Sequence, residues 1–145
     1  MKKCLHRDVA CRNCLLDENQ DRVKLSDFGL SKQGNFYKIP KEENTPIRWA
    51  APEVLSTAIY TAKSDIYSYG ILVWEIFHHA ERPYGDIPNK VIREKIADPQ
   101  FRPAINAKLP KEVKYLMEYC WKAEPERRPT IATVVAYIRS KARKR

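Results

Sequence analysis

The longest apolar pattern in the chain lies between residues 64 and 80, and it predicts a buried helix. A helix that is apolar on every side is buried in a protein core. Ser64 and Asp65 are suited to its N-cap and first turn. The segment is too short to span a bilayer and carries Asp65 and Glu75, so we expect the central helix of a soluble core. Its apolar positions are Ile66, Tyr67, Tyr69, Ile71, Leu72, Val73, Trp74, Ile76 and Phe77.

Shorter patterns lie on both sides of this helix. The apolar runs 15–16 and 23–25 are separated by polar residues, which predicts a β-hairpin. Residues 29–46 are polar and contain Gly and Pro, so we expect a long loop, which is usually functional or disordered. Only helices are expected after this loop. Three amphipathic ones are predicted at about 88–97, 110–121 and 130–142, each beginning near a proline or threonine.

Composition fits one globular domain with an uneven charge. The chain has 145 residues, 43% hydrophobic and 31% charged, with a net charge of +9. The last seven residues carry five positive charges and no negative one. This end is either a solvated helix end or a nuclear address or patch for nucleic acid or anionic lipid. No basic face with interleaved aromatic residues accompanies it, so we expect no specific nucleic-acid partner.

The four cysteines do not predict a metal or redox site. Cys11 and Cys14 match the spacing C-x-x-C, but no second ligand pair follows at a spacing suited to zinc. The pair also does not open a helix in a βαβ unit, as a thioredoxin-like motif does. The N-terminus has no apolar stretch after its charges, so it is not a signal peptide. Reduced thiols are therefore expected.

Three short motifs carry the chemistry, and their order is more informative than any one of them. His6-Arg7-Asp8 is followed by Asn13 at the spacing H-R-D-x-x-x-x-N. Asp27-Phe28-Gly29 follows the predicted hairpin, and Ala51-Pro52-Glu53 closes the long loop. With these motifs in this order, the chain resembles the C-terminal lobe of a protein kinase. The fold class implied is a mainly α kinase C-lobe with a small β-hairpin and no N-lobe, covering residues 1–141, with 142–145 as a basic tail.

The resemblance implies a role for each of these residues. Asp8 would accept the proton of the substrate hydroxyl, and Asn13 and Asp27 would hold Mg²⁺, or Mn²⁺ in its place, because hard cations prefer oxygen ligands. ATP is the implied cofactor, with Asp27 on its metal side and Leu15 under the adenine. Gly29 would give the loop the backbone freedom to change conformation.

Two further segments resemble tyrosine kinases rather than serine/threonine kinases. Ala10-Cys11-Arg12-Asn13 places Arg12 four residues after Asp8, where serine/threonine kinases instead have a lysine two residues after the aspartate. In Pro46-Ile47-Arg48-Trp49 the proline and Trp49 would form the platform for the substrate tyrosine. A single loop tyrosine, Tyr37, is typical of the non-receptor Fes/Fer type. This resemblance implies protein substrates bearing tyrosine and a cytoplasmic location.

The remaining marks of the resemblance concern regulation and structure. Tyr37 is either an exposed loop aromatic or an autophosphorylation site whose phosphate would pair with Arg7 and Lys32 and order the loop. In this family Glu53 pairs with an arginine near the end of the lobe, which corresponds to Arg128. Asp65 would brace the His6 backbone. His6 and Phe28 would belong to the stack of side chains that joins the two lobes.

Several expected parts of a kinase are missing from the sequence. None of the four glycines belongs to a G-x-G-x-x-G loop, and no Val-Ala-x-Lys strand occurs. We expect the chain to begin inside a helix, with residues 1–5 as its end, to leave apolar surface of the central helix exposed, and to have negligible activity alone. Two hypotheses remain, a fragment of an active kinase and a kinase-derived docking module without catalysis. The intact Asp8, Asn13 and Asp27 favour the first.

Overall fold

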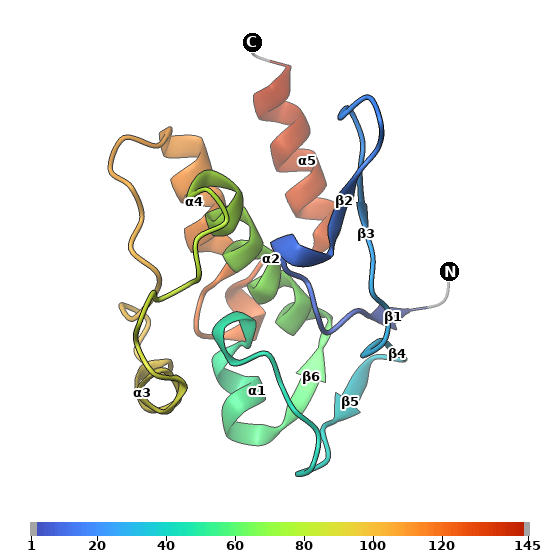
Figure 1. Cartoon of the computed structure of the whole chain (residues 1–145), viewed down its shortest axis with the longest axis vertical. Coiled ribbons are helices and arrows are strands. Elements are labelled where there is room, and N and C mark those ends of the chain that lie inside the picture. The colour runs from blue at the N-terminus through green and yellow to red at the C-terminus, as the bar shows by residue number, and fades with distance from the viewer. Residues whose placement is uncertain (1–2, 144–145) are drawn as a thin grey trace.

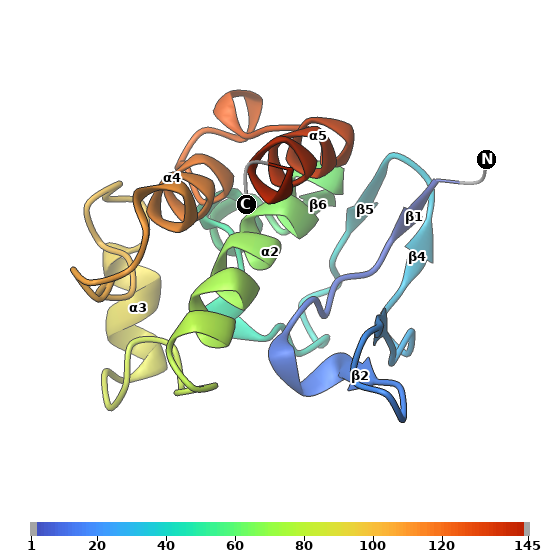
Figure 2. The same cartoon turned by 90° about the horizontal axis from the view of Figure 1, so that it is seen from above.

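A central helix organises the fold. The structure is a computed structural model that describes residues 3–143. Helix α2 (Ala62–Phe77) is largely buried, as the apolar pattern predicts. In Figure 2, α2 lies between the other long helices on one side and the short strands on the other. The core forms around it, so both halves of the chain pack on one element.

The start of α2 differs from the prediction. The helix begins at Ala62, and its N-cap is Thr61 rather than Ser64. Thr61 and Ser64 form a capping box, in which the Thr61 N–H donates to Ser64 Oγ at 3.1 Å. Ser64 therefore takes part in capping the helix from its third position, although it is not the N-cap residue.

The other helices lie close to their predicted positions. Each of the three predicted ones follows a proline or threonine, although the prolines occupy the N-cap position. A short helix after Ala51 was not predicted. The helices are α1 (Pro52–Thr57), α3 (Asn89–Lys95), α4 (Lys111–Cys120) and α5 (Ile131–Ala142), with 3₁₀ turns at Cys11–Asn13, Ile47–Trp49 and Pro125–Arg127 (Figure 1).

Three two-stranded antiparallel ladders complete the fold, of which only the hairpin was predicted. The predicted loop 29–46 contains two strands, and a strand follows α1, so the expectation of helices alone after the loop is wrong. The ladders pair β2 (Cys14–Leu16) with β3 (Val23–Leu25), β1 (Cys4–Leu5) with β4 (Lys32–Gln33), and β5 (Phe36–Lys38) with β6 (Ile59–Thr61).

Both ends of the chain lie partly outside the described residues. The expectation that residues 1–5 end a helix is wrong for Cys4 and Leu5, which form a strand. The part of this expectation that concerns Met1 lies outside the described residues. Of the predicted basic tail, Ala142 ends α5 and Arg143 follows it, whereas 144–145 are not described. Basic side chains in the last turn of α5 stabilise it through the helix dipole.

The end of α2 leaves an apolar surface, as expected. Ile76 is 57% exposed and Phe77 41% exposed. They line an open groove of about 720 Å³ together with residues of α4 and α5, including Leu116 and Ile138. None of the helices among residues 3–143 is long and apolar enough to cross a membrane.

Helices α2 and α4 approach closely at Gly70, and this contact gives a first prediction. A Cβ at Gly70 would lie 3.0 Å from the Cβ of Cys120. Gly70→Leu should therefore lower the free energy of unfolding by about 1–3 kcal/mol, because extra methylene groups force packed helices apart. Urea unfolding followed by circular dichroism measures this. Ala132→Leu, at an exposed position of α5, is the matched control and should change stability little.

Candidate active site

The segment 6–8 is held against the start of α2 by one carboxylate. The backbone N–H groups of His6 and Arg7 donate to the two oxygens of Asp65 at 2.9 and 3.0 Å. The hydroxyl of Tyr60 donates to the same carboxylate at 2.5 Å. Arg7 has a positive φ of 69°, which a non-glycine residue keeps only when its surroundings impose it. These contacts fix the position of Asp8.

Asp8, Arg12 and Trp49 form a connected group at the surface. The guanidinium of Arg12 pairs with Asp8 Oδ1 and lies over the Trp49 ring, with 4.4 Å between its carbon and the ring centroid. The Asp8 side chain is 13% exposed and that of Arg12 45% exposed. The carboxylate is therefore oriented by a cation that itself rests on an aromatic ring.

Asn13 connects Asp8 to the segment before Asp27. Its Nδ2 donates to the backbone carbonyl of Asp8 at 2.7 Å. The backbone carbonyl of Asn13 accepts from the N–H and the hydroxyl of Ser26 at 2.7 and 2.8 Å. Because the amide nitrogen of Asn13 is engaged, its Oδ1 is the side-chain atom left for a cation.

Asn13 and Asp27 offer side-chain oxygens, the kind of ligand that magnesium prefers. Residues 3–143 hold no group of three or more His, Cys, Asp or Glu side chains that could bind a metal by themselves. Magnesium in nucleotide sites is bound by one or two protein oxygens plus substrate phosphates and water. Asn13 and Asp27 are therefore the residues that could contribute protein oxygens to such a site.

The turn 27–29 takes its unusual conformation at the aspartate. Asp27 has a positive φ of 59°, whereas Gly29 does not have a positive φ. The Gly29 N–H donates to Asp27 Oδ1 at 3.2 Å, and a Cβ on Gly29 would lie 3.2 Å from that oxygen. In this conformation Gly29 eases the close approach of its backbone to the carboxylate, and it is not required by a left-handed φ.

His6 uses both ring nitrogens in local contacts. The Asp8 N–H donates to Nδ1 at 3.1 Å, so Nε2 carries the proton and donates to the Ser26 carbonyl at 2.9 Å. The ring of Phe28 meets that of His6 edge-on, with 4.8 Å between centroids. His6 therefore has no free nitrogen to act as a general base.

Glu75 is a site residue that sequence reasoning missed. It lies on α2, is 5% exposed, and its Oε1 accepts from the Cys11 N–H at 3.0 Å and from Trp49 Nε1–H at 2.8 Å. One buried carboxylate thus joins the segments that carry Arg12 and Trp49. An acidic residue within an otherwise apolar helix was the available signal.

The thiols near this site are not activated. Burial, and then the charge of Glu75, raise the pKa of the Cys11 thiol. Burial raises the pKa of Cys14, with contributions from Cys11 and Glu75. The reactive thiolate is therefore disfavoured at both positions.

The segment 46–49 is fixed by a buried arginine within it. Arg48 donates to the carbonyls of Pro83, Gly85 and Ile87 at 2.7, 3.2 and 2.5 Å. Pro46 and Trp49 remain half-buried at the surface. Leu15 lies apart on the hairpin and is 57% exposed, so it offers an apolar surface there.

Tyr37 lies against Arg7 of the segment 6–8. The guanidinium carbon of Arg7 is 4.4 Å from the centroid of the Tyr37 ring, and Lys32 Nζ is 5.0 Å from it. The Tyr37 hydroxyl does not reach Arg7 directly. It donates to Glu43, which in turn pairs with Arg7. Glu43 is a second residue that sequence reasoning did not single out.

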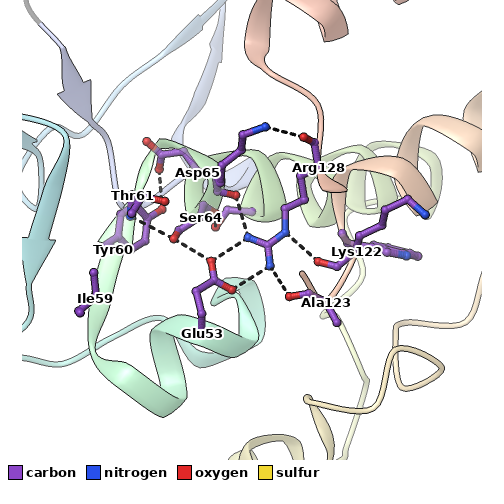
Figure 3. A network of polar contacts seen from close by, with 12 residues as sticks. Glu53, Ile59, Tyr60, Thr61, Ser64, Asp65, Lys122, Ala123 and Arg128 are labelled. Carbon is purple, nitrogen blue, oxygen red and sulfur yellow. Dashed lines mark hydrogen bonds and ion pairs between the residues drawn. The ribbon is translucent and has the colours of Figure 1, made fainter. Parts of the chain in front are cut away.

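Glu53 and Arg128 form an ion pair in which the arginine side chain is buried and the glutamate side chain is 20% exposed. Figure 3 shows the Arg128 fork against both Glu53 oxygens, with N–O distances of 2.7 and 2.8 Å. Ser64 of α2 donates to the same carboxylate at 3.0 Å. The pair therefore ties α1, α2 and the segment before α5 together.

Known proteins share this sequence pattern. Residues 1–138 match a family model described as protein tyrosine and serine/threonine kinase. The chain is 42% identical to tyrosine-protein kinase Fer of Mus musculus over 130 residues, 88% of this chain and 16% of Fer. It is 39% identical over 136 residues to the tyrosine-protein kinase transforming protein Fps of Avian sarcoma virus (strain PRCII), covering 92% of this chain and 25% of Fps. Fer-related kinase 1 of Caenorhabditis elegans is 36% identical over 138 residues, 94% of this chain and 35% of that protein. The chain thus spans no more than 35% of the length of these three relatives. It belongs to the protein tyrosine and serine/threonine kinase family.

Proposed function

We propose that this chain is the substrate- and metal-binding part of a protein tyrosine kinase catalytic domain. Within a longer protein it would transfer the γ-phosphate of ATP to tyrosine residues of protein substrates. The observation that carries this proposal is the connected group of Asp8, Arg12, Asn13 and Trp49, held by Asp65 and Glu75 of α2. Such prepositioned groups supply most of the rate in phosphoryl transfer.

Asp8 is the proposed proton acceptor. Its Oδ1 is paired with Arg12, which leaves Oδ2 for the substrate hydroxyl. As the phenolic O–H bond breaks, the proton goes to Asp8 and the oxygen bonds to the γ-phosphorus. The bond from that phosphorus to the bridging oxygen breaks, and ADP leaves with the electron pair. Asn13 and Asp27 would hold Mg²⁺ or Mn²⁺, which neutralises phosphate charge when bound with the nucleotide.

Tyrosine specificity and location are proposed from the family likeness. Arg12 lies four residues after Asp8, and Pro46 and Trp49 would support the substrate ring. The similarity to Fer and Fps, both named as tyrosine-protein kinases, supports the same acceptor. We place the protein in the cytoplasm on this similarity, with protein substrates as its partners.

Tyr37 is the proposed autophosphorylation site of the loop. It is a half-buried tyrosine beside two cations, Arg7 and Lys32. A phosphate there adds nearly two negative charges, which such cations stabilise. Mass spectrometry of the intact kinase that always finds Tyr37 unmodified would contradict this assignment.

The chain alone should turn over no ATP above background. It contains no glycine-rich loop to cover the phosphates, so the nucleotide would lack the contacts that position and stabilise the transferred group. Pure protein incubated with a tyrosine peptide, Mg²⁺ and ATP should release no more ADP than a sample without enzyme. ADP release that Asp8→Asn abolishes would show that this part is active by itself.

A longer reading frame tests the catalytic proposal itself. If the nucleotide sequence upstream of Met1 encodes a glycine-rich loop and Val-Ala-x-Lys, the longer protein should phosphorylate tyrosine. Asp8→Asn should reduce that rate by at least about a hundredfold, the scale of general acid–base catalysis. Glu42→Gln, at an exposed loop position, is the control. A folded longer protein that phosphorylates nothing would overturn the proposal and favour a docking module.

A further inference from the structure

Glu43 bridges two groups that a phosphate on Tyr37 would join. Its Oε1 accepts a hydrogen bond from the buried Arg7 guanidinium at 2.5 Å, and its Oε2 accepts one from the Tyr37 hydroxyl at 2.9 Å. Two cations lie over the Tyr37 ring, the guanidinium carbon of Arg7 at 4.4 Å and Lys32 Nζ at 5.0 Å from its centroid. A single carboxylate therefore occupies a site built for a negatively charged group.

The site offers more positive charge and more donors than Glu43 uses. Arg7 gives Nη1 to the Leu30 carbonyl at 2.9 Å and Nη2 to Glu43, while its buried Nε finds no partner among residues 3–143. Lys32 adds a second cation against a single carboxylate. An arginine fork suits phosphate better than a point contact does, because two parallel hydrogen bonds can form.

The contacts also set the charge states of the two acids involved. Partial burial opposes ionisation of Glu43, but the hydrogen bonds from Arg7 and Tyr37 outweigh it and lower the pKa of the carboxyl. The hydrogen bond to Glu43, with burial and its charge, raises the pKa of the Tyr37 hydroxyl. Glu43 is therefore an anion at neutral pH, and Tyr37 is a neutral donor.

A phosphate on Tyr37 and the present position of Glu43 exclude each other. Glu43 Oε2 lies at hydrogen-bond distance from the oxygen that would carry the phosphorus, so the phosphate oxygens would need the same space. A phosphate with nearly two negative charges would also repel the carboxylate. Of the two anions, the one covalently fixed to the ring beside Arg7 has the more favourable position.

We propose that Glu43 is an exchangeable substitute for phosphate in the loop. In the unphosphorylated chain its carboxylate joins Arg7 to Tyr37, and a phosphate on Tyr37 replaces it on Arg7. This proposal rests on the proposed phosphorylation of Tyr37. It adds that the loop already has an anionic anchor before modification, so phosphorylation exchanges one anchor for another instead of ordering a free loop.

A two-by-two comparison tests the exchange without any kinase activity. Phosphotyrosine or tyrosine is encoded at position 37, in the native chain and in Glu43→Ala. Amide hydrogen exchange is then measured for the peptide covering 36–43, which includes β5 and the Ile39 N–H that donates to the Ala58 carbonyl at 2.7 Å. Glu42→Ala at the exposed neighbouring position is the matched control, and circular dichroism reports whether each variant is folded.

Fast amide exchange is expected in only one of the four combinations, tyrosine at 37 with Glu43→Ala. With tyrosine at 37, Glu43→Ala should exchange about tenfold faster than the native chain, because charged hydrogen bonds are lost. With phosphotyrosine at 37, the same variant should return to within about threefold of the native rate, since phosphate takes over Arg7. Glu42→Ala should change neither state. Glu43→Gln, which keeps the shape without the charge, should lie between native and Ala and replaces the Ala variant if that variant does not fold.

Two results would overturn the proposal. Native exchange in folded, unphosphorylated Glu43→Ala would show that the carboxylate does not anchor the loop. Fast exchange that persists in the folded phosphotyrosine variant would show that phosphate does not replace Glu43. Both results are independent of the catalytic proposal, since the phosphate is encoded and no ATP is used. Absence of activity in a longer protein would leave this comparison unchanged.

Discussion

Arg128→Ala should cost the chain most or all of its stability. Arg128 is 2% exposed, and all five N–H groups of its guanidinium are used. Two bind the Glu53 oxygens, and the other three donate to the carbonyls of Lys122, Lys63 and Ala123 at 2.7, 3.0 and 3.1 Å (Figure 3). Removing one member of a buried pair leaves the other charge uncompensated and costs about 3–5 kcal/mol. Domains are stable by only about 5–15 kcal/mol, so a chain near the lower end of that range would be largely unfolded at 37 °C without this arginine.

Thermal and urea unfolding followed by circular dichroism measure this effect. Arg127→Ala is the matched control, because Arg127 is the neighbouring arginine and is exposed, so its loss should change stability by less than about 0.5 kcal/mol. Glu53→Gln keeps the shape of the acceptor and should cost less than Arg128→Ala. An unchanged melting temperature in Arg128→Ala would refute the assignment of this pair as a structural anchor.

Elements set by local pattern could be predicted from the sequence, and elements set by distant partners could not. Helix α2 and the hairpin β2–β3 follow from continuous apolar patterns, and both are confirmed. The ladders β1–β4 and β5–β6 pair segments that are distant in the chain, Leu5 with Lys32 and Lys38 with Ile59, so no short turn marks them as it marks the hairpin. Their strands form because tertiary packing brings the segments together, and this packing is invisible in either segment alone.

The same division applies to the site. The spacing of Asp8 and Asn13 within one motif indicated that the two residues lie close together. In the structure Asn13 Nδ2 donates to the backbone carbonyl of Asp8. Glu43 has the composition of an ordinary loop acid among other charges, and nothing local separates it from Glu42. Only the fold brings it to Arg7, 36 residues earlier in the chain. Glu75 differs because an acid in an apolar helix required a partner, and the sequence could have flagged it.

Glu75→Ala should loosen the segments that carry Cys11 and Trp49 as well as destabilise the fold. The Glu75 carboxylate is the acceptor for both Trp49 Nε1–H and the Cys11 N–H. Its removal leaves two N–H groups without their acceptor at a cost of about 1–3 kcal/mol each. We therefore expect a total loss near 3 kcal/mol, the second-largest among these variants. Because the Arg12 guanidinium rests on the Trp49 ring and pairs with Asp8, a freer indole also frees the proposed catalytic carboxylate.

Nuclear magnetic resonance of the indole N–H groups separates positioning from stability. In Glu75→Ala the Trp49 signal should shift and exchange faster with solvent under conditions where the chain is still folded. The indole N–H of Trp74 is an internal control, because it donates to the Ala104 carbonyl at 2.9 Å and not to Glu75. Glu75→Gln keeps an oxygen that can accept both bonds, so it should restore most of the native Trp49 signal. A native Trp49 signal in Glu75→Ala would show that Ser68, which donates to the Trp49 carbonyl at 2.7 Å, holds this segment without the carboxylate.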